Sequence, residues 1–413
     1  MLALVLAVMS AAAPVHLSDL LAEARQKNPE LRAALGRARA AESSVSPAGA
    51  LDDPMLMVQL WNAPIDLSTV PLMVQITQPL PLGGKRAARR DVARGDMAMA
   101  RAAAEAKARD VEAAVAKAYF DLFLADRTIA VDSEIEGTLR SLLASAASRV
   151  AAGRGEESEV LRAQAETLKL RSEGEAALAR RTAATARLVA LLDRPAGSEI
   201  GPTVEPGLAT AIPAVPELLE RAARDRPEMA VARAAVSQVE AKLRLANAEK
   251  VPDVALFLGE MHAFRAPGQA DFLFAGVQVN LPIFSGEKNH PRVAGAEADL
   301  GAMRDDARAI ENRVVSEVAD AHAELTAERR QVELHHQLVP VAQQALASAM
   351  GAYVAGRSAF VMVLDAERDL QMHELDLATH LAMYEQRLAD LQRAVGSDLG
   401  LVQAAESGTR ESH

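Results

Sequence analysis

The residues that could do chemistry in this sequence complete no familiar catalytic or phosphate-binding pattern. Lys85 follows two glycines, as in a phosphate-binding loop. Such a loop, however, needs a glycine where Pro79 stands and a serine or threonine where Arg86 stands. No Gly-x-Ser-x-Gly elbow for a nucleophilic serine occurs either. We therefore expect a protein that is not an enzyme and that uses no cofactor.

Histidine is the main candidate metal ligand, because the sequence contains no cysteine. His335 begins an adjacent histidine pair beside Glu333, but the His-Glu-x-x-His spacing of zinc proteases is missing. His373 and His380 are two helical turns apart and share a helix face, so they could touch a metal weakly. A solvated pair is the simpler interpretation, and we assign no metal site.

The composition indicates long helices and argues against a nucleic-acid partner. The chain has 413 residues and a net charge of −11, so there is no basic surplus to neutralise phosphates. Half of the residues are hydrophobic, but only 3% are aromatic. This alanine-rich composition favours helices that approach one another closely over a compact core filled by aromatic rings.

The N-terminus predicts export. Residues 1–13 form an apolar run that ends in small residues, which is typical of a secretory signal peptide. No lysine or arginine precedes Arg25, so a plain hydrophobic N-terminus is the alternative. No other stretch approaches about 18 continuous apolar residues, so we expect no transmembrane helix. Any membrane crossing must then use strands.

The sequence contains an internal duplication, which determines its predicted organisation. Segment 78–82 recurs as 279–283, and the long segments that follow keep one register of 203 residues through Gly153 and Gly356. We expect four regions after the signal peptide: a first repeat (14–192), a Pro/Gly-rich crossover (193–216), a second repeat (217–395) and a disordered tail (396–413).

Each repeat is predicted to have the same elements in the same order. They are a helix (about 17–46 and 216–250), a strand pair (55–78 and 253–280) and a long helical hairpin with its tip near Gly153 or Gly356. Heptad spacing of apolar residues predicts that the long helices pack side by side. In the first repeat these positions are Val111, Val115, Ala118, Leu122, Ala125 and Ile129.

The strand pairs carry the membrane signal. Val277, Val279 and Leu281 alternate with Gln278 and Asn280, which predicts one apolar and one polar face. This pattern suits a β-barrel with lipid outside and water inside, whereas a small soluble sheet is the alternative. Several aromatic residues lie in or beside the strands: Trp61, Phe257, Phe264, Phe272, Phe274 and Phe284. Four strands cannot close a barrel, so several copies must share one.

The duplication, the order of elements and several motifs together resemble the outer membrane efflux protein (TolC) family, over about residues 17–395. The strongest motifs are segments 78–86 and 281–286, and the hairpin turns at 152–164 and 355–367 also match. The Leu-Gly-Gly-Lys-Arg form at 82–86 resembles the heavy-metal, CzcC-like branch. The sequence departs from its own repeat at His322, which stands where the first half has Tyr119.

The resemblance implies a mainly α fold with a small β part. Long antiparallel α-hairpins would form an α-barrel, and four strands per protomer would contribute to a shared, trimeric transmembrane β-barrel. The partners it implies are two further copies of the chain, a periplasmic adaptor, an inner-membrane pump and outer-membrane lipid. The protein would then lie in the outer membrane with most of the chain in the periplasm.

In this interpretation the protein is a passive exit duct for small solutes or metal cations. The hairpin turns would form the periplasmic gate and the adaptor contact, through Gly153, Arg154, Glu156, Glu157, Gly356, Arg357 and Ser358. Ordinary solvated turn charges remain an alternative for these residues. For the whole chain, the alternatives are a soluble periplasmic coiled-coil adaptor or scaffold, or a protein-secretion duct of the same fold.

Overall fold

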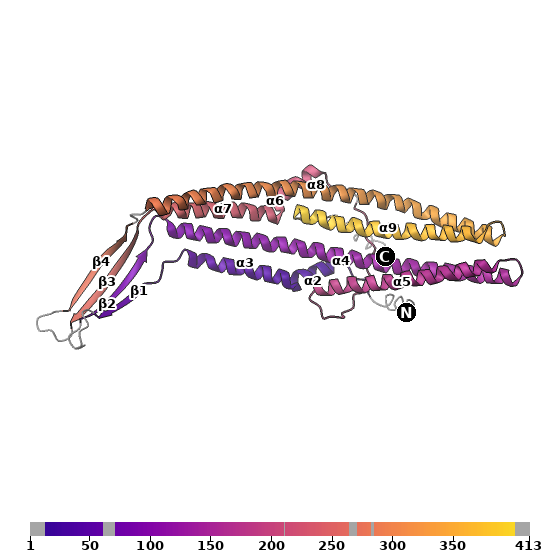
Figure 1. Ribbon diagram of the computed structural model, residues 1–413, viewed down its shortest axis with the longest axis horizontal. Coiled ribbons are helices and arrows are strands. Elements are labelled where there is room, and N and C mark those ends of the chain that lie inside the picture. Colours follow the sequence, from indigo (N-terminus) through magenta and orange to yellow (C-terminus); the bar gives the residue numbers. More distant parts are fainter. Residues whose placement is uncertain (1–12, 61–70, 210, 264–270, 282–284, 401–413) are drawn as a thin grey trace, which may run out of the picture. The chain divides into compact units, whose positions relative to one another are not determined.

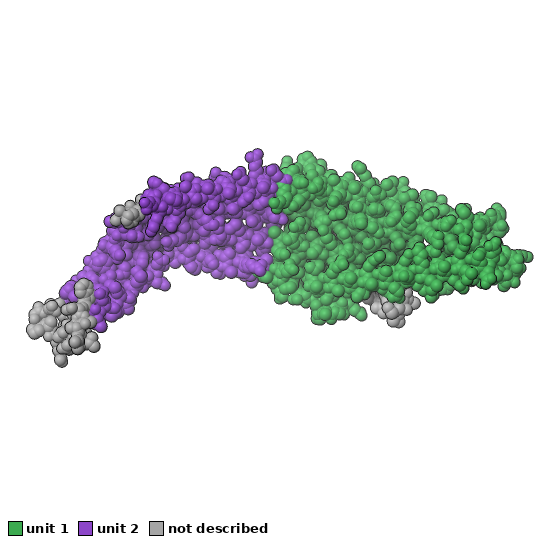
Figure 2. Space-filling model, in the orientation of Figure 1, with its two compact units in different colours: residues 1–33, 105–226, 313–413 green, residues 34–104, 227–312 purple. Residues whose placement is uncertain are grey.

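The computed structural model describes residues 13–60, 71–209, 211–263, 271–281 and 285–400. These residues form two compact units, which are coloured separately in Figure 2. Unit 1 comprises residues 1–33, 105–226 and 313–413, and unit 2 comprises 34–104 and 227–312. Nearly all of the predicted signal peptide, most of the predicted tail, and Trp61, Phe264 and Phe284 lie outside the described residues.

Twelve helices and strands occur among the described residues, and Figure 1 labels them in chain order. The first repeat contains α2 (Leu17–Lys27), α3 (Pro29–Ala48), β1 (Met55–Leu60), β2 (Pro71–Leu80), α4 (Lys85–Ala151) and α5 (Glu157–Leu191). The second contains α6 (Val215–Asp225), α7 (Pro227–Ala248), β3 (Asp253–Ala263), β4 (Phe272–Asn280), α8 (Ser285–Val354) and α9 (Phe360–Val395). The internal duplication is therefore confirmed element by element.

The single helix predicted at the start of each repeat is wrong, because the structure has two helices there. A proline disfavours helical backbone at the residue before it. Asn28 precedes Pro29 and has ψ 123°, and Arg226 precedes Pro227 and has ψ 124°. The Asn28 side chain also caps the next helix, since its Oδ1 accepts a 3.0 Å hydrogen bond from the Leu31 amide.

The core of unit 1 follows the predicted heptads. All six heptad positions from Val111 to Ile129 are buried, and so are Val314, Val318, Ala321, Leu325 and Val332 in the second repeat. Leu338 differs from this pattern, because it is 40% exposed whereas its counterpart Ile135 is buried. Three of these buried positions hold the small side chain of alanine, at Ala118, Ala125 and Ala321.

The crossover, which is part of unit 1, contacts α4 at Tyr119, a position where the two repeats differ. Val15 and Thr203 form a parallel β-bridge. The Tyr119 hydroxyl donates a 2.9 Å hydrogen bond to the Val15 carbonyl and accepts a 3.0 Å bond from the Val204 amide. Tyr119 thus anchors the crossover to α4. His322, at the same position of the second repeat, is only half-buried.

Unit 2 contains one antiparallel sheet with strand order β1-β2-β3-β4, whose strands lie side by side in Figure 1. The central pair joins the two repeats, because β2 of the first pairs with β3 of the second. Strands β2, β3 and β4 have 10, 11 and 9 residues, within the roughly 9–11 that a membrane-spanning strand needs, whereas the described part of β1 has 6. Of the helices in the described part of the chain, none has an apolar run long enough to span a bilayer.

Candidate functional site: an apolar sheet face and two hairpin tips

The strand register gathers apolar side chains on one face of the sheet. Residues paired across antiparallel strands point to the same face. Val277 pairs with Leu256, and Val279 pairs with Val254. Extending these rows through all four strands produces the apolar sheet face, on which the polar side chains are Gln78, Glu260 and His262. Its apolar residues are Leu56, Val58, Leu60, Leu72, Val74, Ile76, Leu80, Val254, Leu256, Leu258, Leu273, Ala275, Val277 and Val279.

This apolar sheet face is exposed in the single chain. Val277 is 61% exposed and Val279 is 46% exposed. Leu281 is also exposed but lies one residue beyond the end of β4. An exposed surface of this kind marks a contact with lipid or with another apolar partner.

The opposite sheet face is mixed, and not polar throughout as the alternation at Gln278 and Asn280 predicted. Gln278 pairs with Ala255, and Asn280 pairs with Asp253. Toward the other end of β4 the same face carries Phe274, whose ring lies 6.2 Å from that of Phe257. The polar half of this face is therefore the half nearest the helices, because both Asp253 and Asn280 lie at strand ends that adjoin helical segments.

The two outer strands leave the sheet open. β1 and β4 are its edges, and within the described residues each pairs on one side only. An unpaired strand edge presents backbone groups that need hydrogen-bond partners, and in lipid each unsatisfied group costs several kcal/mol. Both edges of the sheet are therefore open to pairing with further strands.

Lys85 stabilises the turn between β2 and α4. Its ammonium group donates to the Val251 carbonyl at 2.7 Å and to Asp253 Oδ1 at 2.5 Å, and its side chain is 5% exposed. Gly83 and Gly84 before it both have positive φ, and Val251 would clash with any Cβ at Gly83. The Gly-Gly-Lys motif thus connects sheet and helix.

The two hairpin tips have the same backbone geometry. Gly153 has φ 66° and its amide donates to the Val150 carbonyl at 2.9 Å, while the next amide donates to the Arg149 carbonyl at 2.8 Å. Gly356, with φ 71°, makes the matching pair of bonds to Tyr353 and Ala352. Each tip is therefore a Schellman motif that needs a left-handed residue, as predicted. Both tips lie at the same end of unit 1 in Figure 1.

The tip charges singled out from the sequence are solvent-exposed. Arg154, Arg357, Glu156 and Glu157 are all exposed, and Ser358 is half-buried. Glu156 accepts a 3.0 Å hydrogen bond from Ser158 at the start of α5. The ion pairs among the described residues of this chain do not include either arginine. The structure therefore does not bring Arg357 together with Glu156 or Glu157 within one chain.

The contacts that join the two hairpins near their tips involve residues that sequence reasoning missed. Arg149 lies 4.5 Å above the ring of Tyr353 and donates to its carbonyl at 2.9 Å. The Tyr353 hydroxyl, in turn, donates to Glu159 at 2.9 Å. The sequence offered one signal, since tyrosine is rare in this chain and Tyr353 stands only three residues before a tip glycine.

A second connection between the hairpins contains a buried carboxyl group without a cation of its own. Arg368 binds Glu166 through two hydrogen bonds of 3.2 and 2.6 Å, and this contact lowers the pKa of Glu166. Glu367 is 2% exposed and one of its oxygens has no hydrogen-bond partner among the described residues. Burial, together with the nearby Glu166 charge, raises the pKa of Glu367 to about 7.

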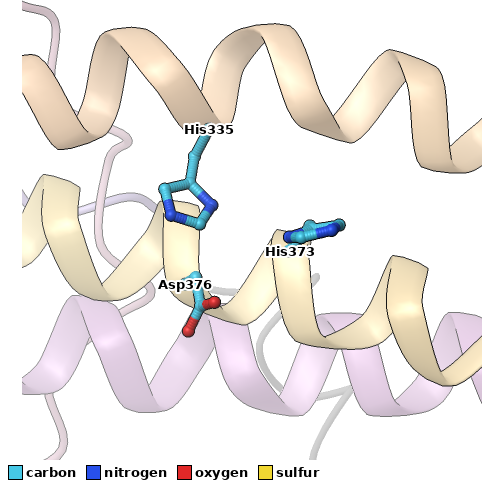
Figure 3. Close-up of side chains that lie close together, drawn as sticks. All are labelled: His335, His373 and Asp376. Atoms are coloured by element: carbon cyan, nitrogen blue, oxygen red, sulfur yellow. The ribbon is translucent and has the colours of Figure 1, made fainter.

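Histidines from two helices meet in the described part of unit 1. Sequence reasoning paired His373 with His380 and assigned no metal site. The structure instead places ligand atoms of His335, His373 and Asp376 within 4.8 Å of one another (Figure 3). His335 comes from α8, and its approach to α9 depends on the antiparallel packing of the hairpin, which no local spacing encodes.

Comparisons with known proteins agree with this geometry. The family model described as outer membrane efflux protein matches residues 20–194 and 218–397, one match for each repeat. The chain is 25% identical to the cobalt-zinc-cadmium resistance protein CzcC of Cupriavidus metallidurans, over 94% of this chain and 91% of that protein.

Solved structures share the fold over most of their length. The outer-membrane channel OprN superposes with a TM-score of 0.78 at 20% identity, covering 92% of this chain and 90% of that one. The outer membrane protein VceC from Vibrio cholerae has a TM-score of 0.77 at 21% identity, covering 92% and 96%. Because the family model matches both repeats across most of the sequence, the chain belongs to the outer membrane efflux protein family.

Proposed function

We propose that three copies of this chain form the exit duct of a tripartite efflux system, in which an adaptor and an inner-membrane pump deliver the cargo. The duct itself is passive. Its cargo would be small solutes or metal cations, and the relative CzcC, named for resistance to cobalt, zinc and cadmium, favours cations. The apolar sheet face with its two open edges is the observation that carries the proposal.

The sheet supports assembly because, in a single chain, its edge strands β1 and β4 each pair on one side only. The apolar face, with Val277, Val279 and the following Leu281, suits lipid contact, and the polar alternate positions suit a water-filled lumen. Three copies of a four-stranded sheet would supply twelve strands and leave no edge. In that arrangement β4 of one copy pairs with β1 of the next.

The absence of cysteine from the sequence makes this arrangement testable by disulfide trapping. In a double variant, Val58→Cys in β1 and Val277→Cys in β4 occupy opposite edges of the sheet, so they cannot join within one chain. Each single variant is the control. We expect oxidation of membranes to give a covalent trimer from a double variant, with the cysteines moved along β1 in steps of two to find the register. Monomers throughout that series would reject the shared sheet.

The hairpin tips are the proposed gate and adaptor contact. Arg154 and Arg357 are exposed, and carboxylates at the tip occur only in the first repeat, as Glu156 and Glu157. A ring of six tips would place each Arg357 beside a Glu-bearing tip of a neighbouring copy. An exposed ion pair contributes only about 0–1 kcal/mol, which suits a gate that must open.

Single-channel conductance in planar bilayers tests the gate. Arg357→Ala, or Glu156→Ala with Glu157→Ala, should raise the conductance at low salt. High salt should produce the same rise in the parent protein, because salt screens exposed charges over about 10 Å or less. Arg180→Ala, which removes an exposed arginine of α5 well away from the tip, is the control. Parent-like conductance of the tip variants at low and high salt would identify these charges as ordinary turn residues.

A further inference from the structure

Three potential metal ligands converge between helices α8 and α9, outside the sheet and the tips. His335 lies on α8, while His373 and Asp376 lie one helical turn apart on the same face of α9. One ligand atom from each lies within 4.8 Å of the others, and all three side chains are half-buried. Figure 3 shows the His335 imidazole directed across the gap toward the two α9 residues.

The imidazoles in this cluster have unsatisfied nitrogen atoms. Nδ1 of His335 and Nδ1 of His373 are each buried without a hydrogen-bond partner among the described residues. A buried polar atom left in this way is unfavourable. Two such nitrogens on facing residues beside a carboxylate indicate a position where a further positively charged group can be held.

A further histidine, His380, lies beside the cluster. The ring of His380 lies 5.2 Å from that of His335, and its Nδ1 is 2.8 Å from a carboxylate oxygen of Glu328. A carboxylate that binds one nitrogen of a histidine orients the ring and makes the other nitrogen a better donor to a metal. His380 thus lies beside the three residues in an orientation fixed by α8.

We propose that His335, His373 and Asp376 form a binding site for one divalent transition-metal ion per chain. Two imidazoles and a carboxylate suit borderline cations such as Zn²⁺, Co²⁺ and Ni²⁺ better than Mg²⁺ or Ca²⁺, which prefer all-oxygen sites. Three protein ligands leave at least one coordination position open to water or to the adjoining His380. The bound ion can therefore exchange, and it also links α8 to α9.

The internal duplication provides a comparison within the chain. In the register of 203 residues, the three ligands correspond to Asp132, Leu170 and Glu173 of the first repeat. Leu170 packs in the apolar core and Asp132 accepts a 3.1 Å hydrogen bond from Gln371. No imidazole occupies the corresponding positions, so the site belongs to the second repeat alone.

The test is a Co²⁺ titration of the full-length protein, purified in detergent without a polyhistidine tag. A visible absorption band of four- or five-coordinate Co²⁺ should saturate at one ion per chain and disappear when Zn²⁺ is added. His335→Ala, His373→Ala and Asp376→Asn should each weaken binding by about tenfold to a hundredfold or more. His336→Ala is the matched control, because His336 is the next residue of α8 and is exposed.

Circular dichroism and size-exclusion chromatography of every variant separate lost binding from lost folding. Binding by the parent and by His336→Ala, together with its loss in the folded variants at the three positions, supports the site. The proposal is overturned if the parent binds no Co²⁺ beyond the level of a folded variant lacking both histidines, or if His336→Ala weakens binding equally. Metal binding is measured independently of trimer formation and conductance, so failure of this site leaves the duct proposal intact.

Discussion

Glu367 should make the stability of the protein depend on pH in a direction opposite to that of a paired carboxylate. The side chain is 2% exposed and its pKa is raised from 4.5 to about 7, first by burial and then by the neighbouring Glu166. The folded state therefore holds the Glu367 proton more tightly than the unfolded chain does. This contribution to stability is fully present below pH 4.5 and is lost as the pH rises through 7.

Replacing Glu367 by glutamine removes this dependence, because the amide stays neutral and has nearly the same shape. The first repeat already has Gln164 at the corresponding position. A shift from 4.5 to about 7, at 1.36 kcal/mol per pKa unit, sets an upper limit of about 3 kcal/mol on the gain at pH 8. At pH 5 the carboxyl of the folded parent is protonated, so the two proteins should differ by less than about 1 kcal/mol.

Thermal unfolding followed by circular dichroism at pH 5, 6.5 and 8 provides the assay. Glu367→Gln should unfold a few degrees above the parent at pH 8, and the difference should shrink steadily toward pH 5. Glu157→Gln, which neutralises an exposed carboxylate at the start of α5, is the control and should show no such trend. The reasoning would be refuted if the unfolding temperatures of Glu367→Gln and the parent differed by the same amount at all three pH values. Burial would then not favour the protonated form of Glu367 in the folded state.

Three further predictions concern the sheet, the turn that joins it to α4, and the hairpin tips. Val279→Arg lies on the apolar sheet face, one residue before the end of β4. It should cost more than the ~0–1 kcal/mol of an interfacial position but less than the ~2–4 kcal/mol of the midplane, and it should reduce the amount of protein in the outer-membrane fraction. Gln278→Arg should be tolerated, and equal tolerance of the two changes would reverse or reject the assigned faces. Lys85→Met should lower the unfolding temperature, because the buried lysine neutralises Asp253 and binds the Val251 carbonyl; an unchanged melting curve would contradict this. Arg149→Met should increase proteolysis at the hairpin tips while leaving the amount of protein in the membrane unchanged. If the variant and the parent are cleaved equally, the contact between Arg149 and Tyr353 does not stabilise the tips.

Much of the fold was encoded in local patterns that can be recognised in the sequence. Heptads predicted the buried faces of the long helices. The glycines at positions 153 and 356, which permit a left-handed backbone, predicted both tips. The break at Asn28 is also encoded locally, because the proline that follows it disfavours helical backbone there. The strand pairs were predictable because alternation has a period of two residues, which no helix shares.

The sequence by itself determined the duplication, the order of elements, the tips and the apolar alternation at Val277 and Val279, because each depends on residues close together in the chain. Only the tertiary structure decided that β2 pairs with β3 and that Arg149 meets Tyr353. It also brought His335 to His373, although 38 positions separate them in the chain. Such contacts depend on the rotation and offset of packed helices and strands, and many sequences with the same local pattern are compatible with other offsets.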